Sequence, residues 1–319
     1  MRGYHSEGRR WLEEALAMNG RGSPEVRAMA LAGAGVLAEE QGDLDRAREA
    51  CQEGLELLAH EGREASEAKL NLLECLGWVA CLREEYGQAQ QLYEESLALS
   101  REMSDSWWIA SSLSSLASVS GFRGDSERAI ALYEQSMDLF REQGAKQSLA
   151  FCLNNLAMVV CSKGQGDLGR AAKLTEESVA LQRELGTRGG VSMGLCNLGW
   201  MALLQDDLGR AAALYRESLS LSWDSGLNPL VQGGLEGFAC VAGARGDVER
   251  AARLWGAAQA LHETKGILRD PDFLAEADAR ISAVRSGMGE EAWEAAWRSG
   301  RAMTLEEAVS YALEEEARG

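Results

Sequence analysis

The chain has 319 residues, of which 46% are hydrophobic, and its 50 acidic and 32 basic side chains give a formal net charge of −18. A chain this acidic lacks the basic stripe that phosphate binding needs, so we expect neither direct nucleic-acid binding nor attraction to an anionic membrane. The seven cysteines are odd in number and form no Cys-x-x-Cys pair, which favours reduced thiols in the cytoplasm over a disulfide framework.

The composition predicts an all-α protein. Only three prolines interrupt the chain, and the strong helix formers Glu, Ala, Leu, Arg and Gln dominate it. No run of alternating β-branched residues suggests a strand. The first ten residues lack the apolar core of a signal peptide, and no stretch approaches the roughly 18 consecutive apolar residues of a membrane-spanning helix.

A short pattern recurs along the chain, as in the segment from Gly124 to Met137, and every copy has a small residue at the same place. These small residues are Gly8, Ala47, Ala89, Ala129, Ala171, Ala211 and Ala251, at intervals of 39, 42, 40, 42, 40 and 40 residues. Self-similarity with a fixed period of this size predicts a solenoid, in which each repeat buries its apolar side against its neighbours.

Each repeat is predicted to be an antiparallel pair of helices, A and B. Between Lys146 and Gly186, apolar residues at helical spacing indicate a helix A that reaches Val160, and Asp167 stands where helix B begins. Small residues in helix A allow close packing and are predicted at Gly35, Gly77, Ala117, Ala157, Gly199 and Ala239. Glycines are predicted to end the B helices at Gly62, Gly144, Gly186, Gly226 and Gly266.

The two ends depart from this pattern. The segment from Gly3 to Met18 is predicted to be a B helix without an A helix before it, so residues 1–22 are a half repeat, and six complete repeats follow up to residue 266. A solenoid that begins on half a repeat suggests a piece of a longer protein. Residues 267–319 are predicted to form a helical C-terminal cap, whose last helix begins with a capping box from Thr304 to Glu307.

The repeat pattern resembles that of the tetratricopeptide-repeat family. Gly199 and Ala211 match the small residue of the family's first helix and the alanine of its second, and Leu198, Tyr215 and Ser218 fill other signature positions. The usual repeat has about 34 residues, and the units of about 40 residues here resemble those of kinesin light chains and of bacterial MalT-type regulators. The resemblance implies a right-handed superhelical solenoid.

The C-terminal part carries a second, narrower resemblance. The segments 250–258, 293–297 and 305–308 are similar to the end of the helical arm in bacterial ATPase-linked regulators of the MalT/LuxR type. That resemblance implies a sensor or regulatory arm of a signalling or transcriptional regulator, accompanied upstream by a nucleotide-binding module. The phosphate-binding pattern Gly-x-x-x-x-Gly-Lys-Ser/Thr is absent from this chain. The alternative is a freestanding adaptor that scaffolds a protein complex.

No motif of the sequence predicts catalysis, a metal site or a cofactor. The three histidines, His5, His60 and His262, are far apart and have no ligand-type partner at helical spacing. No Gly-x-Ser-x-Gly turn surrounds a serine, and the acidic pairs lie on the polar sides of their predicted helices. We therefore expect a non-catalytic protein that binds a protein, a peptide or a small effector.

In tetratricopeptide arrays the A helices line a concave groove, and the resemblance transfers that role to positions counted from the small residue of each A helix. The candidate groove residues are Met29, Ala32, Val36, Asn71, Glu74, Trp78, Ser111, Ser114, Ser118, Phe151, Asn154, Asn155, Met158, Met193, Cys196, Asn197, Trp200, Glu236 and Cys240. The aromatic residues are expected to anchor a ligand, the methionines to adapt to it, and the asparagines to hydrogen-bond a peptide backbone.

Two alternatives stay open for these residues. Trp78 and Trp200 either anchor a ligand or pack between neighbouring repeats, because tryptophan is commonly half-buried in both roles. Asn155 and Asn197 either contact a peptide or hydrogen-bond a neighbouring helix. No Lys/Arg clamp for a terminal carboxylate occurs among the groove positions, which argues against a co-chaperone role.

Overall fold

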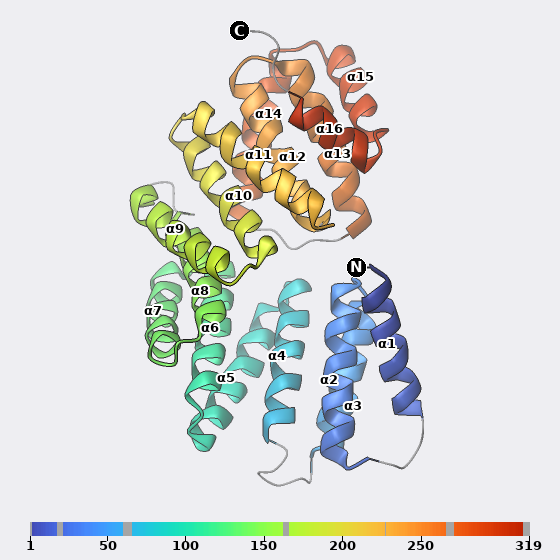
Figure 1. Cartoon of the computed structure of the whole chain (residues 1–319), viewed down its shortest axis with the longest axis vertical. Coiled ribbons are helices and arrows are strands. Elements are labelled where there is room, and N and C mark those ends of the chain that lie inside the picture. The colour runs from blue at the N-terminus through green and yellow to red at the C-terminus, as the bar shows by residue number, and fades with distance from the viewer. Residues whose placement is uncertain are drawn as a thin grey trace. The chain divides into compact units, whose positions relative to one another are not determined.

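The computed structural model describes residues 2–17, 22–59, 66–161, 166–226, 228–265 and 271–314, which form sixteen α-helices and no strand (Figure 1). The expected all-α architecture is confirmed. The chain divides into unit 1, Met1–Ala145, and unit 2, Lys146–Gly319. Unit 1 holds α1 Arg2–Ala17, α2 Pro24–Glu40, α3 Leu44–Leu57, α4 Ser66–Leu82, α5 Tyr86–Met103, α6 Ser106–Phe122 and α7 Ser126–Glu142. Unit 2 holds α8 Lys146–Cys161, α9 Leu168–Glu184, α10 Arg188–Leu204, α11 Leu208–Asp224, α12 Asn228–Ala244, α13 Val248–Lys265, α14 Pro271–Ser286, α15 Glu290–Arg301 and α16 Leu305–Leu313.

Consecutive helices pack in pairs within each unit, as the repeat pattern predicts. In unit 1 the pairs are α2 with α3, α4 with α5 and α6 with α7, and α1 packs on α2. In unit 2 the pairs are α8 with α9, α10 with α11 and α12 with α13. The first helix of each pair corresponds to helix A and the second to helix B. The predicted division between repeats and cap, at residues 266 and 267, lies outside the described residues and stays a prediction.

The ends of the B helices are set by local sequence. An aspartate carboxylate accepts a hydrogen bond from the backbone N–H three residues later at Asp43, Asp125, Asp167 and Asp207, with distances of 3.3, 3.2, 2.8 and 3.0 Å. Glycines with positive φ follow the B helices at Gly144, Gly186 and Gly226, as predicted. The other two predicted helix-ending glycines, Gly62 and Gly266, lie outside the described residues, as do the side chains of His5 and His60.

The small residues of the A helices make room for large side chains of the paired B helix. A Cβ placed at Gly77 would overlap the Tyr93 ring, and one at Gly199 would lie 3.0 Å from the Tyr215 ring. Both tyrosines are buried, with 3% and 0% of their surfaces exposed. The structure therefore confirms that these positions serve packing, because any side chain there would push the two helices apart.

Three helices follow α13 in unit 2. Helix α15 lies against α13 so closely that a Cβ at Gly300 would overlap the backbone carbonyl of Arg253. The Trp297 indole N–H also donates to Gln259 Oε1 at 2.7 Å. The predicted capping box is present at the start of α16, where Glu307 N–H donates to Thr304 Oγ1 at 3.2 Å and Thr304 N–H to the Glu307 carboxylate at 2.7 Å.

Within the described part of the chain, every helix is too short or too polar to cross a lipid bilayer.

Candidate binding surface

Exposed apolar side chains gather on the A helices of unit 1. Eight large hydrophobic residues are exposed among those described, and four of them lie on α2 and α4: Val26, Met29, Val36 and Trp78. Met29 and Val36 are two helical turns apart, so they share one side of α2. Their exposed fractions are 42% and 45%, and that of Trp78 is 36%. We call Met29, Val36, Glu39, Asn71 and Trp78 the A-helix face of unit 1.

Two polar contacts join α2 to α4 across this face. The Trp78 indole N–H donates to Glu39 Oε1 at 3.1 Å. Two turns earlier on α4, Asn71 Nδ2 donates to the backbone oxygen of Glu67 at 3.0 Å and lies 3.9 Å from Met29 Sδ. The contact with Glu39 holds Trp78 at one end of the face, and the contact with Asn71 holds Met29 at the other. On α2, Val36 lies between Met29 and Glu39.

The Glu39 carboxyl is the ionisable group of this face. Burial raises the pKa of Glu39, the Trp78 N–H opposes that rise by stabilising the carboxylate, and the charge of Glu40 adds to it. The group is therefore partly withdrawn from water beside an aromatic ring. A carboxylate at the edge of an indole ring is suited to a cation, because the carboxylate and the ring face both attract positive charge.

Glu74 makes hydrogen bonds to side chains of two neighbouring helices. Its carboxylate accepts hydrogen bonds from Ser115 at 2.7 Å, Ser96 at 3.0 Å and Ser112 at 3.4 Å, so it joins α4 to α5 and α6. Burial raises the pKa of Glu74, and the three hydroxyl donors oppose that rise. The serines of neighbouring helices engage the carboxylate of this half-buried residue, and the prediction that Glu74 lines a groove stays a prediction. Ser114 is also buried, whereas Ser111 and Ser118 are half-buried.

The A helices of unit 2 carry a second partly exposed set. Phe151 on α8 is 49% exposed, and Asn155 and Met158 follow it on the same side of the helix, both half-buried. Met193 and Asn197 on α10 are half-buried as well. We call these five residues the A-helix face of unit 2, and their role in binding stays a prediction.

Other predicted groove residues of unit 2 are buried. Trp200 has 3% of its surface exposed, Asn154 3% and Glu236 4%, and Cys240 is also buried. Asn154 Oδ1 accepts a hydrogen bond from Asn197 Nδ2 at 2.9 Å, and Glu236 Oε1 accepts one from Gln232 at 3.0 Å. The burial of Trp200 favours its packing alternative, and the hydrogen bond of Asn197 favours its inter-helix alternative. Ligand binding by these residues stays a prediction.

The two tryptophans have the same place in the repeat but differ in burial. Each follows the small glycine of its A helix, Gly77 or Gly199. Trp78 is 36% exposed and Trp200 3% exposed. The residue on the preceding A helix that corresponds to Glu39, the partner of Trp78, is Cys161, so the indole–carboxylate hydrogen bond of Trp78 has no counterpart of the same chemistry at that position.

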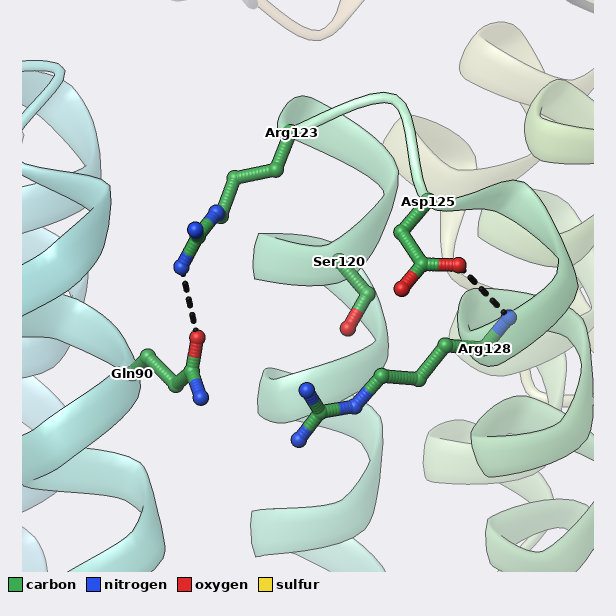
Figure 2. Close-up of a pocket in the computed structure, with 5 residues that line it drawn as sticks. All are labelled: Gln90, Ser120, Arg123, Asp125 and Arg128. Atoms are coloured by element: carbon green, nitrogen blue, oxygen red, sulfur yellow. Dashed lines mark hydrogen bonds between the residues drawn. The ribbon is translucent and has the colours of Figure 1, made fainter.

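A cavity that the sequence did not predict lies in unit 1, away from the A-helix face. Its volume is about 340 Å³, and it is lined by Gln90, Ser120, Arg123, Asp125 and Arg128 (Figure 2). Gln90 comes from α5, Ser120 from α6, and Asp125 caps α7. The only sequence signal is the recurring Asp-x-x-Arg at the start of B helices, which points to capping and not to a cavity.

The described residues contain no group of three or more His, Cys, Asp or Glu side chains arranged to hold a metal ion. The seven cysteines are free thiols, and six of them are buried.

Comparisons with known proteins agree with the helix-pair architecture. The model of the tetratricopeptide repeat matches residues 108–184. A Rap protein in complex with competence and sporulation factor superposes with a TM-score of 0.63 at 10% identity, over 95% of this chain and 92% of that one. The quorum sensor NprR from B. thuringiensis, in its apo form, gives a TM-score of 0.55 at 13% identity, over 98% of each chain.

A third similar structure is a larger protein. It is a signal transduction ATPase with numerous domains from Pyrococcus horikoshii, which has a tetratricopeptide-repeat sensor. The TM-score is 0.61 at 11% identity, over 95% of this chain and 45% of that one. No curated protein sequence matches the chain at a significant level. Because these identities are low, the likenesses show the fold alone. Together with the repeat model, which matches residues 108–184, and the packing of the helix pairs, they show a tetratricopeptide-repeat-like solenoid fold.

Proposed function

We propose that the chain is a non-catalytic binding module that holds an extended peptide segment of a partner protein against the A-helix face of unit 1. The observation that carries this proposal is the exposure of Met29, Val36 and Trp78 on two adjacent A helices. Exposed apolar side chains that gather on one surface mark interaction sites, and tryptophan is enriched among the residues that dominate binding energy.

The dimensions of the face suit an extended chain. Asn71 and Trp78 are seven residues apart on α4, which corresponds to roughly 10 Å along the helix axis. Three residues of an extended peptide, at about 3.4 Å each, span the same length. Asn71 Oδ1 accepts no hydrogen bond from the described residues, so it is available to a peptide N–H.

The chemistry of the face favours a basic and apolar peptide. A Lys or Arg side chain that lies over the Trp78 ring gains a cation–π interaction and reaches the Glu39 carboxylate. Leucine- or isoleucine-like side chains would cover Met29 and Val36. The net charge of −18 adds a long-range attraction for basic segments, which raises the rate of encounter.

The A-helix face of unit 2 supports a second contact of the same kind. Phe151 offers an exposed aromatic ring, Met158 and Met193 offer adaptable apolar surface, and the Asn155 amide is suited to a peptide backbone. Each face binds by itself in this proposal.

We further propose that this module is the sensor arm of a bacterial signalling or transcriptional regulator, whose nucleotide-binding module responds to the bound partner. The likeness to the tetratricopeptide-repeat sensor protein supports this assignment, since the chain corresponds to 45% of that larger protein. The free cysteines support a reducing compartment such as the cytoplasm. A freestanding adaptor is the alternative, and co-purification with an ATPase from the native host distinguishes the two.

The peptide proposal is tested by selecting peptides from a random phage-displayed library on the full chain. We expect the selected peptides to be enriched in Lys, Arg and large apolar residues. Calorimetry with one synthetic selected peptide should then show at least about tenfold weaker binding to Trp78→Ala, the equivalent of 1.4 kcal/mol. Glu39→Gln should weaken binding of the basic peptide more than that of its Lys/Arg→Gln derivative.

The matched control is Trp11→Ala on α1, because Trp11 is 60% exposed and lies outside the A-helix face. Its affinity for the selected peptide should equal that of the unmodified chain. Selection of acidic peptides, or equal losses in the Trp78 and Trp11 variants, would contradict the proposal.

A further inference from the structure

The cavity between α5, α6 and α7 has two guanidinium groups in its wall. Arg123 follows the last residue of α6, and Arg128 lies in the first turn of α7, with the α7 cap Asp125 between them in sequence. Figure 2 shows both side chains reaching from the α6–α7 turn toward the side of the cavity where Gln90 lies. All five lining residues belong to unit 1.

Arg123 has no carboxylate partner among the described residues. Its Nη1 donates to the amide oxygen Oε1 of Gln90 at 2.7 Å, and the remaining N–H groups of the guanidinium are not used by protein acceptors. The corresponding residue one repeat earlier is Arg83, directly after α4, and it forms an ion pair with Asp45. The positive charge of Arg83 is thus paired with a carboxylate, whereas the positive charge of Arg123 meets only the amide dipole of Gln90.

Arg128 is weakly paired. Its Nη2 lies 3.7 Å from Glu94 Oε1, and the same oxygen also accepts a hydrogen bond from Gln90 Nε2 at 2.8 Å. The corresponding contacts in other repeats are Arg46 to Glu13 at 3.8 Å and Arg210 to Glu176 at 3.2 Å. This contact therefore recurs between successive B helices. It uses one nitrogen of the Arg128 guanidinium and leaves its other N–H groups able to donate to a ligand.

The balance of charge in the wall limits what the cavity accepts. Arg123 and Arg128 contribute two positive charges, and Asp125, which accepts the Arg128 backbone N–H at 3.2 Å, contributes one negative charge. The resulting surplus attracts an anion, and nearby Glu94, which lies 3.7 Å from Arg128 Nη2, offsets part of that attraction.

We propose that this cavity binds a carboxylate group, held by Arg123 and Arg128. Guanidinium groups present N–H donors in a planar fork that matches the two oxygens of a carboxylate. A volume of about 340 Å³ exceeds the size of one carboxylate, so the ligand carries further atoms. The carboxylate belongs either to an acidic side chain of a partner peptide or to a free small organic acid. This site is separate from the A-helix face of unit 1 and does not depend on the proposed peptide binding.

The test is a titration of the full, 15N-arginine-labelled chain, in which the side-chain Nε–H signals are followed by NMR at low ionic strength. N-acetyl-glutamate amide serves as the probe for an acidic side chain, succinate as the free acid, N-acetyl-glutamine amide as the neutral control and inorganic phosphate as the dianion. We expect the two carboxylates to shift the signals of Arg123 and Arg128, and added salt to reduce the shifts. The tighter of the two carboxylates identifies the source of the ligand.

Arg123→Gln should weaken carboxylate binding at least about tenfold, because it removes the unneutralised charge. Arg83→Gln is the matched control, since Arg83 has the same place in the previous repeat but is paired with Asp45; it should leave binding unchanged. The proposal is overturned if neither carboxylate shifts the signals, if the neutral amide shifts them equally, if phosphate binds more tightly than both carboxylates, or if the two variants lose affinity alike. Both arginines lie at the surface of turns, and far-UV circular dichroism checks that the variants fold.

Discussion

Truncation of Trp78 and of Trp200 to alanine should have unequal effects on stability, although the two residues have the same place in their repeats. Trp200 is 3% exposed and Trp78 is 36% exposed, a difference of about a third of the side-chain surface. The full burial of a tryptophan covers up to about 250 Å². A third of that area, at about 25 cal/mol per Å², corresponds to roughly 2 kcal/mol.

The cavity left in the core acts in the same direction, whereas the hydrogen bond that Trp78 makes acts in the opposite one. Trp200→Ala leaves an enclosed cavity, and core Trp→Ala substitutions cost about 3–5 kcal/mol in free energy of unfolding. At Trp78 water fills the space that the ring leaves, and the lost hydrogen bond to Glu39 contributes about 0.5–1.5 kcal/mol. We therefore expect Trp200→Ala to lower the free energy of unfolding by about 1–2 kcal/mol more than Trp78→Ala does.

The assay is urea-induced unfolding of both full-length variants, followed by far-UV circular dichroism and compared with Trp11→Ala as a surface control. Because solenoids can unfold in stages, each variant is compared in the transition that its substitution shifts. The outcome that refutes the reasoning is a loss for Trp78→Ala that equals or exceeds the loss for Trp200→Ala. That result would place Trp78 in the core and remove it from the A-helix face.

Further outcomes follow from two other parts of the chain. Gly300→Ala should lower the free energy of unfolding by at least about 2 kcal/mol, because its Cβ overlaps the Arg253 carbonyl. Gly87→Ala, in the first turn of α5, where a Cβ meets open space, should not lower it in the same urea assay. For Glu74 the pKa is raised in the folded chain above its ordinary value of 4.5, so its contribution to stability is largest below that pH and is lost as the pH rises through the raised pKa. Glu74→Gln should remove this pH-dependent contribution, so the unmodified chain should be less stable than the variant at pH 7 and should regain stability relative to it toward pH 4. A difference in urea midpoint between the two proteins that does not change across this pH range would contradict the assignment.

Corresponding positions of the repeats are alike in how they pack, but they differ in how exposed they are, so the repeat pattern predicted packing better than exposure. The contact of Gly77 with Tyr93 depends on two helices of one repeat, and the pattern that places a small residue opposite a large one was visible in the sequence. The pattern of one repeat does not record that Trp78 is exposed and Trp200 buried. Exposure depends on side chains of neighbouring helices, such as Glu39 of α2 beside Trp78.

The amino-acid sequence by itself determined the helix pairs, their period of about 40 residues, the aspartates that cap the B helices and the capping box at Thr304. These features depend on residues close in sequence, so that local hydrogen bonding and apolar spacing are sufficient to predict them. Only the tertiary structure decided that Glu74 accepts hydrogen bonds from serines of α5 and α6, and that Gln90, Arg123 and Arg128 line one cavity. The physical reason is that these sites combine side chains of successive helices, about 20 to 40 residues apart, whose orientation depends on how the helices pack against one another.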